Sequence, residues 1–384
     1  MQAATYKGLD LNNETDTLIH NAFTKGERLQ FQTFSNEIFD TIADLDKNYS
    51  MYELSIALTN AFFERINDYF NQYFTNGKIL DGQAILKIAI EAVQKWEDAH
   101  GYMIHKATAY TFLGNTYLVT GNLDLAFTMI HDSLIQDTYT YPRLGKDYKK
   151  EAPAYLFATL NINNPVSMLY KYVQEMKNKV ESIINAHNFA CESAISQFSY
   201  TTFHNKFLQR GSLEPIVFYF VYTIMTALNL ENWDKKLLAN NAFSRLRQVD
   251  LLFNLSLVVD KTLSDKYTSE FISEGVFSYL KQVEQITDAN AGALNKCFNY
   301  SNGKPLKISE ETIENLIPAL LNNTITYRGQ NTSYRMRAML AVWNVRNFSA
   351  HNLTGIDKLL TTVSYENILN LLMSALFFAI EVLP

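Results

Sequence analysis

Apolar side chains recur at three- and four-residue steps along almost the whole chain, and this period constrains the fold more than any other feature. A clear example is the apolar stripe formed by Leu54, Leu58, Ala61, Ile66 and Tyr69, which is the pattern of one face of an amphipathic helix. No strict apolar–polar alternation is long enough to predict a strand. With 7 prolines and 14 glycines in 384 residues, the chain also lacks the frequent turns that strand-rich folds need. We therefore predict an all-α fold.

Length and local composition predict two domains. A chain of 384 residues is longer than one compact core usually supports. Residues 137–153 interrupt the helical period with prolines, a glycine and charges of both signs, so we interpret them as a linker. We predict a helical domain over residues 1–150, and a long connecting helix followed by a C-terminal helical bundle over residues 151–384.

The N-terminal domain contains a weak internal repeat. Its positions are Ala92, Trp96 and Ala99 and, 34 residues later, Ala126, Ile130 and Ser133. The second unit adds Tyr110, Leu113, Gly114 and Tyr117, followed by Gly121 and Asn122. The pattern resembles tetratricopeptide repeats, in which small residues let two antiparallel helices approach closely. Because two units are fewer than a free-standing array needs, we predict helix pairs within a larger domain that contacts a protein partner or an inhibitor.

A long connecting helix is predicted to begin at Asn164-Pro165, with the asparagine as its cap and the proline in its first turn. Two series of residues recur at sevens: Val166, Val173, Val180, His187 and Ala194, and Leu169, Met176, Ile183 and Ala190. Such a seam predicts lengthwise packing on a helix of the same chain or of a second copy. We interpret His187, on the seam, as a core histidine.

Charge and cysteine usage limit the class of protein. The formal net charge of −6 argues against a surface coated in basic residues, so a nucleic-acid site must be a local patch. Cys191 and Cys297 are far apart, which fits a reducing compartment and excludes a disulfide framework or a cysteine-based zinc site. The N-terminus shows no export signal, and the apolar stretch Ile368–Leu383 is too short and too polar to span a bilayer. We predict a cytoplasmic protein with no membrane segment.

One segment near the C-terminus concentrates positive charge. No Asp or Glu occurs between Glu314 and Asp357, and this interval contains Arg328, Arg335, Arg337 and Arg346. Unopposed arginines in an acidic chain favour a local phosphate site. The alternative is that these arginines pair with acidic residues from elsewhere in the fold.

The positive segment ends in the sequence Arg346-Asn347-Phe348-Ser349-Ala350-His351. Four residues separate the arginine from the histidine, and an asparagine follows the arginine. This pattern resembles the Arg-(four to six residues)-His motif of the HEPN superfamily. An apolar helix leads into the motif and another, capped by Ser364, follows it, an order similar to the C-terminal HEPN domains of CRISPR-associated and abortive-infection ribonucleases. The resemblance implies an endoribonuclease of prokaryotic antiviral defence or of a toxin system.

The residues themselves suggest a metal-independent reaction on RNA. His351 can exchange a proton at neutral pH, whereas Arg346 stays protonated and can stabilise charge on a phosphate. Asn347 can donate to the phosphate or orient His351. No carboxylate cluster or second histidine lies nearby to hold a metal, so we predict no metal and no cofactor. The consistent reaction is attack by an RNA 2′-hydroxyl on its neighbouring phosphate.

Transesterification needs a proton acceptor and a proton donor, but each chain offers one such histidine. The HEPN resemblance implies a homodimer with two copies of Arg346 and His351 around one cleft. These residues lie about 140° apart on an ideal helix, so we predict that the helix ends or distorts near Arg346. Arg328, Arg335, Arg337, Tyr327 and Tyr334 are predicted to bind single-stranded RNA through its phosphates and unpaired bases, with both tyrosines in a loop.

A second class of function stays open. The first 150 residues show no buried parallel strand followed by a glycine-rich turn, so nothing predicts the cyclic-nucleotide sensor domain of many CRISPR-associated HEPN nucleases. The chain could instead be a non-catalytic helical module that binds proteins or nucleotides. In that case Arg346 and His351 would be structural or would bind only a nucleotide phosphate.

Overall fold

The computed structural model describes residues 5–6, 9–11, 13–191, 197–237, 242–266, 280, 295–308, 310–349 and 353–383. Helices dominate these residues, which confirms the all-α prediction. The chain divides into two compact units, here called unit 1 (residues 1–157 with 167–169) and unit 2 (residues 158–166 and 170–384). The division therefore falls between Phe157 and Ala158, whereas the sequence placed a boundary near residue 150.

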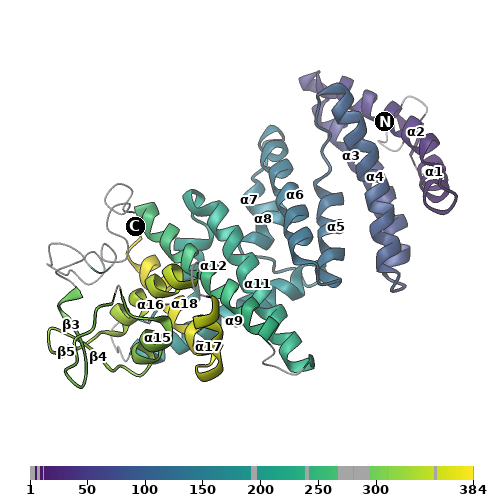
Figure 1. Ribbon diagram of the computed structural model, residues 1–384. Helices are drawn as coiled ribbons and strands as arrows, with labels where there is room; N and C mark the ends of the chain where they lie inside the picture. The colour runs from purple at the N-terminus through teal and green to yellow at the C-terminus, as the bar shows by residue number, and fades with distance from the viewer. Residues whose placement is uncertain are drawn as a thin grey trace. The chain divides into compact units, whose positions relative to one another are not determined.

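Unit 1 contains one short hairpin and a series of helices (Figure 1). Its elements are β1 (Thr5–Tyr6), β2 (Leu9–Asp10), α1 (Asn13–Thr24), α2 (Arg28–Asp46), the 3-10 turn η1 (Tyr49–Met51), α3 (Tyr52–Phe74), α4 (Ile79–His100), α5 (Ala107–Val119), α6 (Leu123–Arg143), α7 (Tyr148–Glu151) and α8 (Pro153–Ala158), which reaches the division. Helices that follow one another in sequence pack together, above all α5 with α6 and α3 with α4.

The pair α5–α6 has the close approach that the repeat pattern predicts. A Cβ atom placed on Gly114 would lie 2.9 Å from Cγ1 of Ile130 and 3.2 Å from the carbonyl oxygen of Ala126. Between the helices, Gly121 adopts a φ of 77°, and Asn122 caps α6 by accepting from the backbone N–H of Leu125 at 3.3 Å. Small residues therefore set the distance between these two helices.

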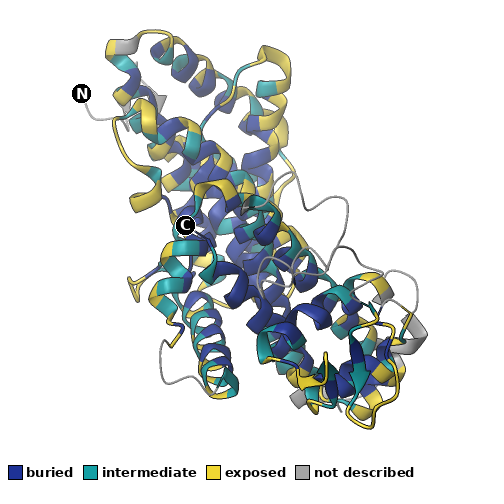
Figure 2. Ribbon diagram, turned by 90° about the vertical axis from the view of Figure 1, so that its left-hand side faces the viewer, coloured by how far each residue is buried: buried dark blue, intermediate teal, exposed yellow. Residues whose placement is uncertain are grey.

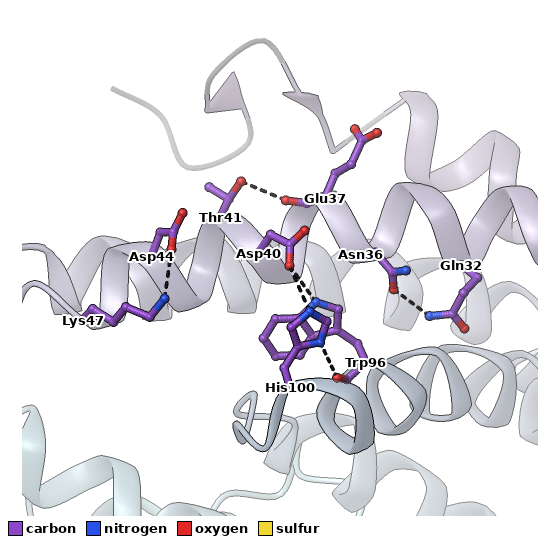
Figure 3. Close-up of polar contacts among 9 residues, drawn as sticks. All are labelled: Gln32, Asn36, Glu37, Asp40, Thr41, Asp44, Lys47, Trp96 and His100. Atoms are coloured by element: carbon purple, nitrogen blue, oxygen red, sulfur yellow. Dashed lines mark hydrogen bonds and ion pairs between the residues drawn. The ribbon is translucent and has the colours of Figure 1, made fainter.

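A polar cluster fastens α2 to α4 (Figure 3). The indole Nε1 of Trp96 donates to Oδ1 of Asp40 at 2.9 Å, and the His100 ring stacks on the indole with centroids 4.3 Å apart. Gln32, about two turns before Asp40 in α2, donates to the carbonyl of Ala92 in α4 at 2.9 Å. A buried indole thus finds the partner that its N–H requires.

Residues 137–153 are not the linker that we predicted. Residues 137–143 form the last turns of α6, and α7 and α8 follow it closely. Asp137 is buried because its carboxylate pairs with Nε2 of His105 at 3.1 Å. The helix ends at Arg143, and Gly145, two residues later, has a φ of 68° that suits a glycine. Asp137, one of the charged residues that suggested a linker, is therefore paired inside unit 1.

Unit 2 is a helical bundle with a small sheet. Its elements are α9 (Tyr170–Cys191), α10 (Tyr200–Phe203), the π-helical turn η2 (His204–Leu208), the 3-10 turn η3 (Gly211–Leu213), α11 (Glu214–Leu237), α12 (Ala242–Lys266), β3 (Phe298–Tyr300), α15 (Ile313–Leu321), β4 (Ile325–Tyr327), β5 (Gln330–Asn331), α16 (Tyr334–Ser349), α17 (Leu353–Thr362) and α18 (Tyr365–Glu381).

Helix α18 lies at the centre of this bundle. It packs against α9, α12 and α16, and Ser364 precedes it at the N-cap position, as the sequence predicts. Its residues from Ile368 to Ile380 are buried apart from Asn370, and Figure 2 shows buried stretches of this kind in dark blue along the inner faces of the helices. The prediction that the apolar C-terminal stretch is a buried helix is confirmed.

Helix α9 begins later than predicted. It starts at Tyr170, because the Asn164 side chain accepts from the N–H of Val166 at 3.1 Å and holds a turn there. Val166 is consequently 87% exposed and leaves the seam. The seam from Val173 to His187 is buried, and it packs against α11 and α18 of the same chain. That packing removes this stretch of seam as a surface for dimerisation.

The three-stranded antiparallel sheet β3–β4–β5 was not predicted, because its strands are only two or three residues long. In the hairpin β4–β5, Tyr327 pairs with Gln330. The two residues between them, Arg328 and Gly329, have φ angles of 49° and 78°. Positive φ at both central positions is typical of the type I′ turns that match the twist of a hairpin.

Among the described residues, one stretch passes a test for membrane spans by length and composition, residues 211–231, which include most of α11. Half of that stretch is buried within the protein. Its buried positions, such as Val217, Phe220 and Val221, belong to a helix that packs on α9 and α12. A core helix of this kind meets the same length and composition criteria.

Candidate active site

Arg346 and Asn347 lie in the last turn of α16, at the end of an apolar helix. The helix continues without a break through Arg346 and ends at Ser349, three residues later. Of the two predicted alternatives, an end or a distortion near Arg346, the structure has a helix end. The next described residue after this helix is Leu353, the first of α17. His351 lies outside the described residues, so it stays a prediction that Arg346 and His351 lie in one site.

Arg346 forms an ion pair with Asp260 of α12. Its Nη1 atom donates to Oδ1 of Asp260 at 2.6 Å, and the side chains are 40% and 26% exposed. Burial raises the pKa of Asp260, and the nearby guanidinium of Arg346 acts against that rise. A guanidinium has five N–H donors, and Asp260 occupies one of them. The pair therefore fixes the orientation of Arg346 while its side chain still reaches solvent.

Two asparagines lie near Arg346 in the sequence, Asn344 before it and Asn347 directly after it. Asn347 is exposed on the helix surface, where its amide is accessible to a ligand. Asn344 is fully buried, and neither its Oδ1 nor its Nδ2 has a hydrogen-bond partner within the described residues. A buried amide without partners costs about 1–3 kcal/mol. Sequence reasoning missed Asn344, although it is the only polar side chain in the apolar run from Met339 to Val345 and could have been noticed for that reason.

The arginines at the start of α16 are held by other parts of unit 2. Nη2 of Arg335 contacts the carboxylate of Glu381 in α18 at 3.5 Å, and Nη1 of Arg337 donates to the carbonyl of Leu320 in α15 at 3.0 Å. Together with the Arg346–Asp260 pair, these contacts show that the acid-free segment does meet acidic residues from elsewhere. The alternative interpretation of its charge holds for Arg335 and Arg346.

The predicted RNA-binding residues do not form one cluster. Tyr327 is the last residue of β4, where its ring packs on Phe298, and the exposed Arg328 lies over it with 5.3 Å between guanidinium and ring centroid. Tyr334 is the first residue of α16 and not a loop residue; its hydroxyl is 3.0 Å from that of Ser374. Arg335 and Arg346 share one face of α16 but are about 16 Å apart along its axis.

Charge is distributed unequally between the two units. Residues 1–157 contain 20 acidic and 13 basic residues, whereas residues 158–384 contain 19 acidic and 20 basic residues. The net negative charge of the chain therefore belongs to unit 1. Since phosphates are attracted by local positive charge, unit 2 is the part of the chain better suited to a polyanion.

Within the described part of the chain, no group of three or more His, Cys, Asp or Glu side chains is arranged to hold a metal ion. The fold and the motif position together define a two-unit helical protein with a half-exposed, anchored arginine at one helix end. Comparison with protein-family models, with curated proteins and with solved structures finds no match to this chain.

Proposed function

We propose that this protein is a HEPN-type, metal-independent endoribonuclease that cleaves single-stranded RNA at a composite site of a homodimer. The observation that carries the proposal is the Arg346-Asn347 pair at the accessible end of α16, with the Arg346 guanidinium anchored by Asp260. An arginine that is oriented before the substrate arrives loses less freedom when it binds a phosphate. Prokaryotic antiviral defence or a toxin system is the setting that the HEPN resemblance implies.

In the proposed reaction His351 of one protomer accepts the proton of an RNA 2′-hydroxyl. The 2′-oxygen then forms a bond to the adjacent phosphorus, and the bond from phosphorus to the 5′-oxygen of the next nucleotide breaks. His351 of the other protomer donates a proton to that 5′-oxygen, which leaves a 2′,3′-cyclic phosphate and a 5′-hydroxyl. Arg346 stabilises the negative charge on the phosphate oxygens, and Asn347 contributes a hydrogen bond.

The test is incubation of the purified dimer with a labelled, unstructured RNA in excess EDTA. We expect cyclic-phosphate ends from the parent, and rates lower by a factor of about 100 to 10,000 for His351→Ala and Arg346→Ala. The matched controls are His131→Ala and Arg247→Ala, which replace exposed residues of the same types. Circular dichroism and light scattering would establish that all variants keep the helix content and oligomeric state of the parent.

A strict requirement for a divalent metal, or equal cleavage by the parent and by His351→Ala, would contradict this mechanism. RNA binding without cleavage by a confirmed dimer would favour the alternative, a non-catalytic helical module. One observation favours this alternative. Arg335 pairs with Glu381 and Arg346 pairs with Asp260, and arginines paired within the fold can serve structure alone.

A further inference from the structure

Unit 2 contains a cavity of about 620 Å³ that the proposed reaction does not use. Its lining comes from the end of α9, the segment from Gln197 through α10 to the π-helical turn η2, the start of α16 and the end of α18. Its volume lies within the range of small-ligand pockets, which extends from about 300 to 1,000 Å³. π-helical turns are rare and occur frequently at functional sites.

His187 lines this cavity. Packing in the core accounts for its aromatic ring but not for its two polar ring nitrogens. The imidazole is 3% exposed and lies among aromatic rings, with centroids 4.8 Å from Phe378 and 5.2 Å from Phe377. Within the described residues its ring nitrogens contact only the sulfur of Cys191, at 3.6 and 3.8 Å. Sulfur is a weak hydrogen-bond partner, so a donor and an acceptor are poorly satisfied next to an open cavity.

The surroundings of the cavity set the protonation states of His187 and Cys191. Burial lowers the pKa of His187 to about 4, and the nearby positive charge of Arg335 acts in the same direction. Burial also raises the pKa of the Cys191 thiol to about 11. At neutral pH the cavity therefore holds a neutral imidazole and a protonated thiol, which is a poor nucleophile.

The charged groups of the cavity have a net positive charge. Lys206, on η2, donates to the carbonyl oxygens of Leu383 at 2.8 Å and of Glu381 at 3.5 Å, and an ammonium has a third N–H donor. Arg335 lies 4.8 Å above the Phe378 ring and reaches the Glu381 carboxylate only at 3.5 Å. The ring and the carboxylate both contact this guanidinium at the wall of the cavity.

Aromatic side chains form part of the walls, beside polar residues such as Gln197, Thr202 and Ser333. The Phe198 backbone is held in place because the Asn188 amide exchanges two hydrogen bonds with it, at 2.9 and 3.0 Å. Tyr334 and Phe378 contribute two further rings. Flat apolar surfaces of this kind stack on heterocyclic bases, and a planar guanidinium beside an ammonium binds a phosphate.

We propose that this cavity binds a nucleoside monophosphate, with its phosphate on Arg335 and Lys206 and its base among the aromatic rings beside His187. The neutral imidazole then donates to and accepts from the edge of the base, and Glu381 accepts from a ribose hydroxyl. This proposal holds whether or not the chain cleaves RNA, because Arg346 lies about 16 Å further along α16 than Arg335.

The test is isothermal titration calorimetry of the full chain with adenosine, guanosine, cytidine and uridine 5′-monophosphates. His187→Phe preserves the aromatic packing and removes both ring nitrogens, and Arg335→Gln removes the charge. The control is Lys358→Gln, which neutralises an exposed residue of α17 that does not line the cavity. We expect one binding event per chain, weakened at least tenfold by each cavity variant and unchanged by the control.

Two probes separate the parts of the ligand. Adenosine without phosphate and inorganic phosphate alone are each expected to bind at least tenfold more weakly than the best monophosphate. Inorganic phosphate that binds as tightly as the monophosphates would overturn the nucleotide assignment, and so would a folded parent that binds none of the four. If His187→Phe and Arg335→Gln bound the monophosphates as tightly as the parent, the assignment of the ligand to this cavity would be overturned. This holds irrespective of the result of the RNA cleavage assay.

Discussion

The contact between α5 and α6 makes a quantitative prediction for Gly114→Ala. In a helix interior alanine is favoured over glycine by about 0.5–1 kcal/mol, so an unconstrained site would gain stability. At Gly114 the new methyl group would lie 2.9 Å from Cγ1 of Ile130 and 3.2 Å from the backbone oxygen of Ala126. The Ile130 side chain can rotate, but the carbonyl moves only if the two helices separate.

Overpacking of this kind costs typically about 1–3 kcal/mol. Subtracting the helix-propensity gain of about 0.5–1 kcal/mol from the middle of that range, about 2 kcal/mol, we expect Gly114→Ala to lower the free energy of unfolding by about 1–1.5 kcal/mol. For a domain of about 150 residues that corresponds to a decrease in melting temperature of about 2–6 °C. Gly114→Val, which adds two more methyl groups at the same place, is expected to lower it further.

The measurement is differential scanning calorimetry of the full chain, with each variant compared at one protein concentration. Gly211→Ala is the control, because nothing lies within 4 Å of a Cβ atom placed there and its φ is not positive. It is expected to be neutral or to stabilise by up to about 1 kcal/mol. A melting temperature for Gly114→Ala that equals or exceeds that of the parent would refute the close approach of these helices.

Two further predictions concern Asn344 near the end of α16 and Arg328 in the hairpin β4–β5. Asn344→Leu removes a buried amide that has no partner within the described residues, so we expect it to raise the free energy of unfolding by about 1–3 kcal/mol. A loss of stability, measured by calorimetry, would instead show that the amide is satisfied in the folded chain. Arg328→Gln is expected to reduce the slope of log K against log salt for RNA binding by about one, whereas Arg337→Gln, which faces the Leu320 carbonyl, is expected to leave it nearly unchanged. Equal slopes for the parent and Arg328→Gln would remove the hairpin from the RNA-binding surface.

Local patterns were sufficient for the helices and several of their ends. The apolar period is a property of neighbouring residues on one helix face, so it predicted a buried helix after Ser364 and a close helix pair around Gly114. The same reasoning failed where a side chain competes with the backbone. Asn164 forms a turn with Val166 although its position before a proline is typical of a helix start.

The short sheet shows a different limit of local reasoning. Strands β3, β4 and β5 contain two or three residues each, which is too few for alternation to be recognised. Arg328, at the turn, takes a positive φ that is uncommon for this residue type. The register of the hairpin, in which Tyr327 pairs with Gln330, is local. The pairing of Tyr327 with Phe298 is not, because strand β3 meets the hairpin only in the folded chain.

By itself, the sequence determined that the chain is helical, that its C-terminal apolar stretch is a core helix, and that its arginines gather in one acid-free segment. Only the tertiary structure decided which groups those arginines meet. Asp260 is 86 residues from Arg346 and Glu381 is 46 residues from Arg335, and the cavity beside His187 is lined from α9, α10, η2, α16 and α18. Helix faces follow from spacing along the chain, whereas ion pairs and cavities follow from which faces pack together, and that choice is made by the whole core.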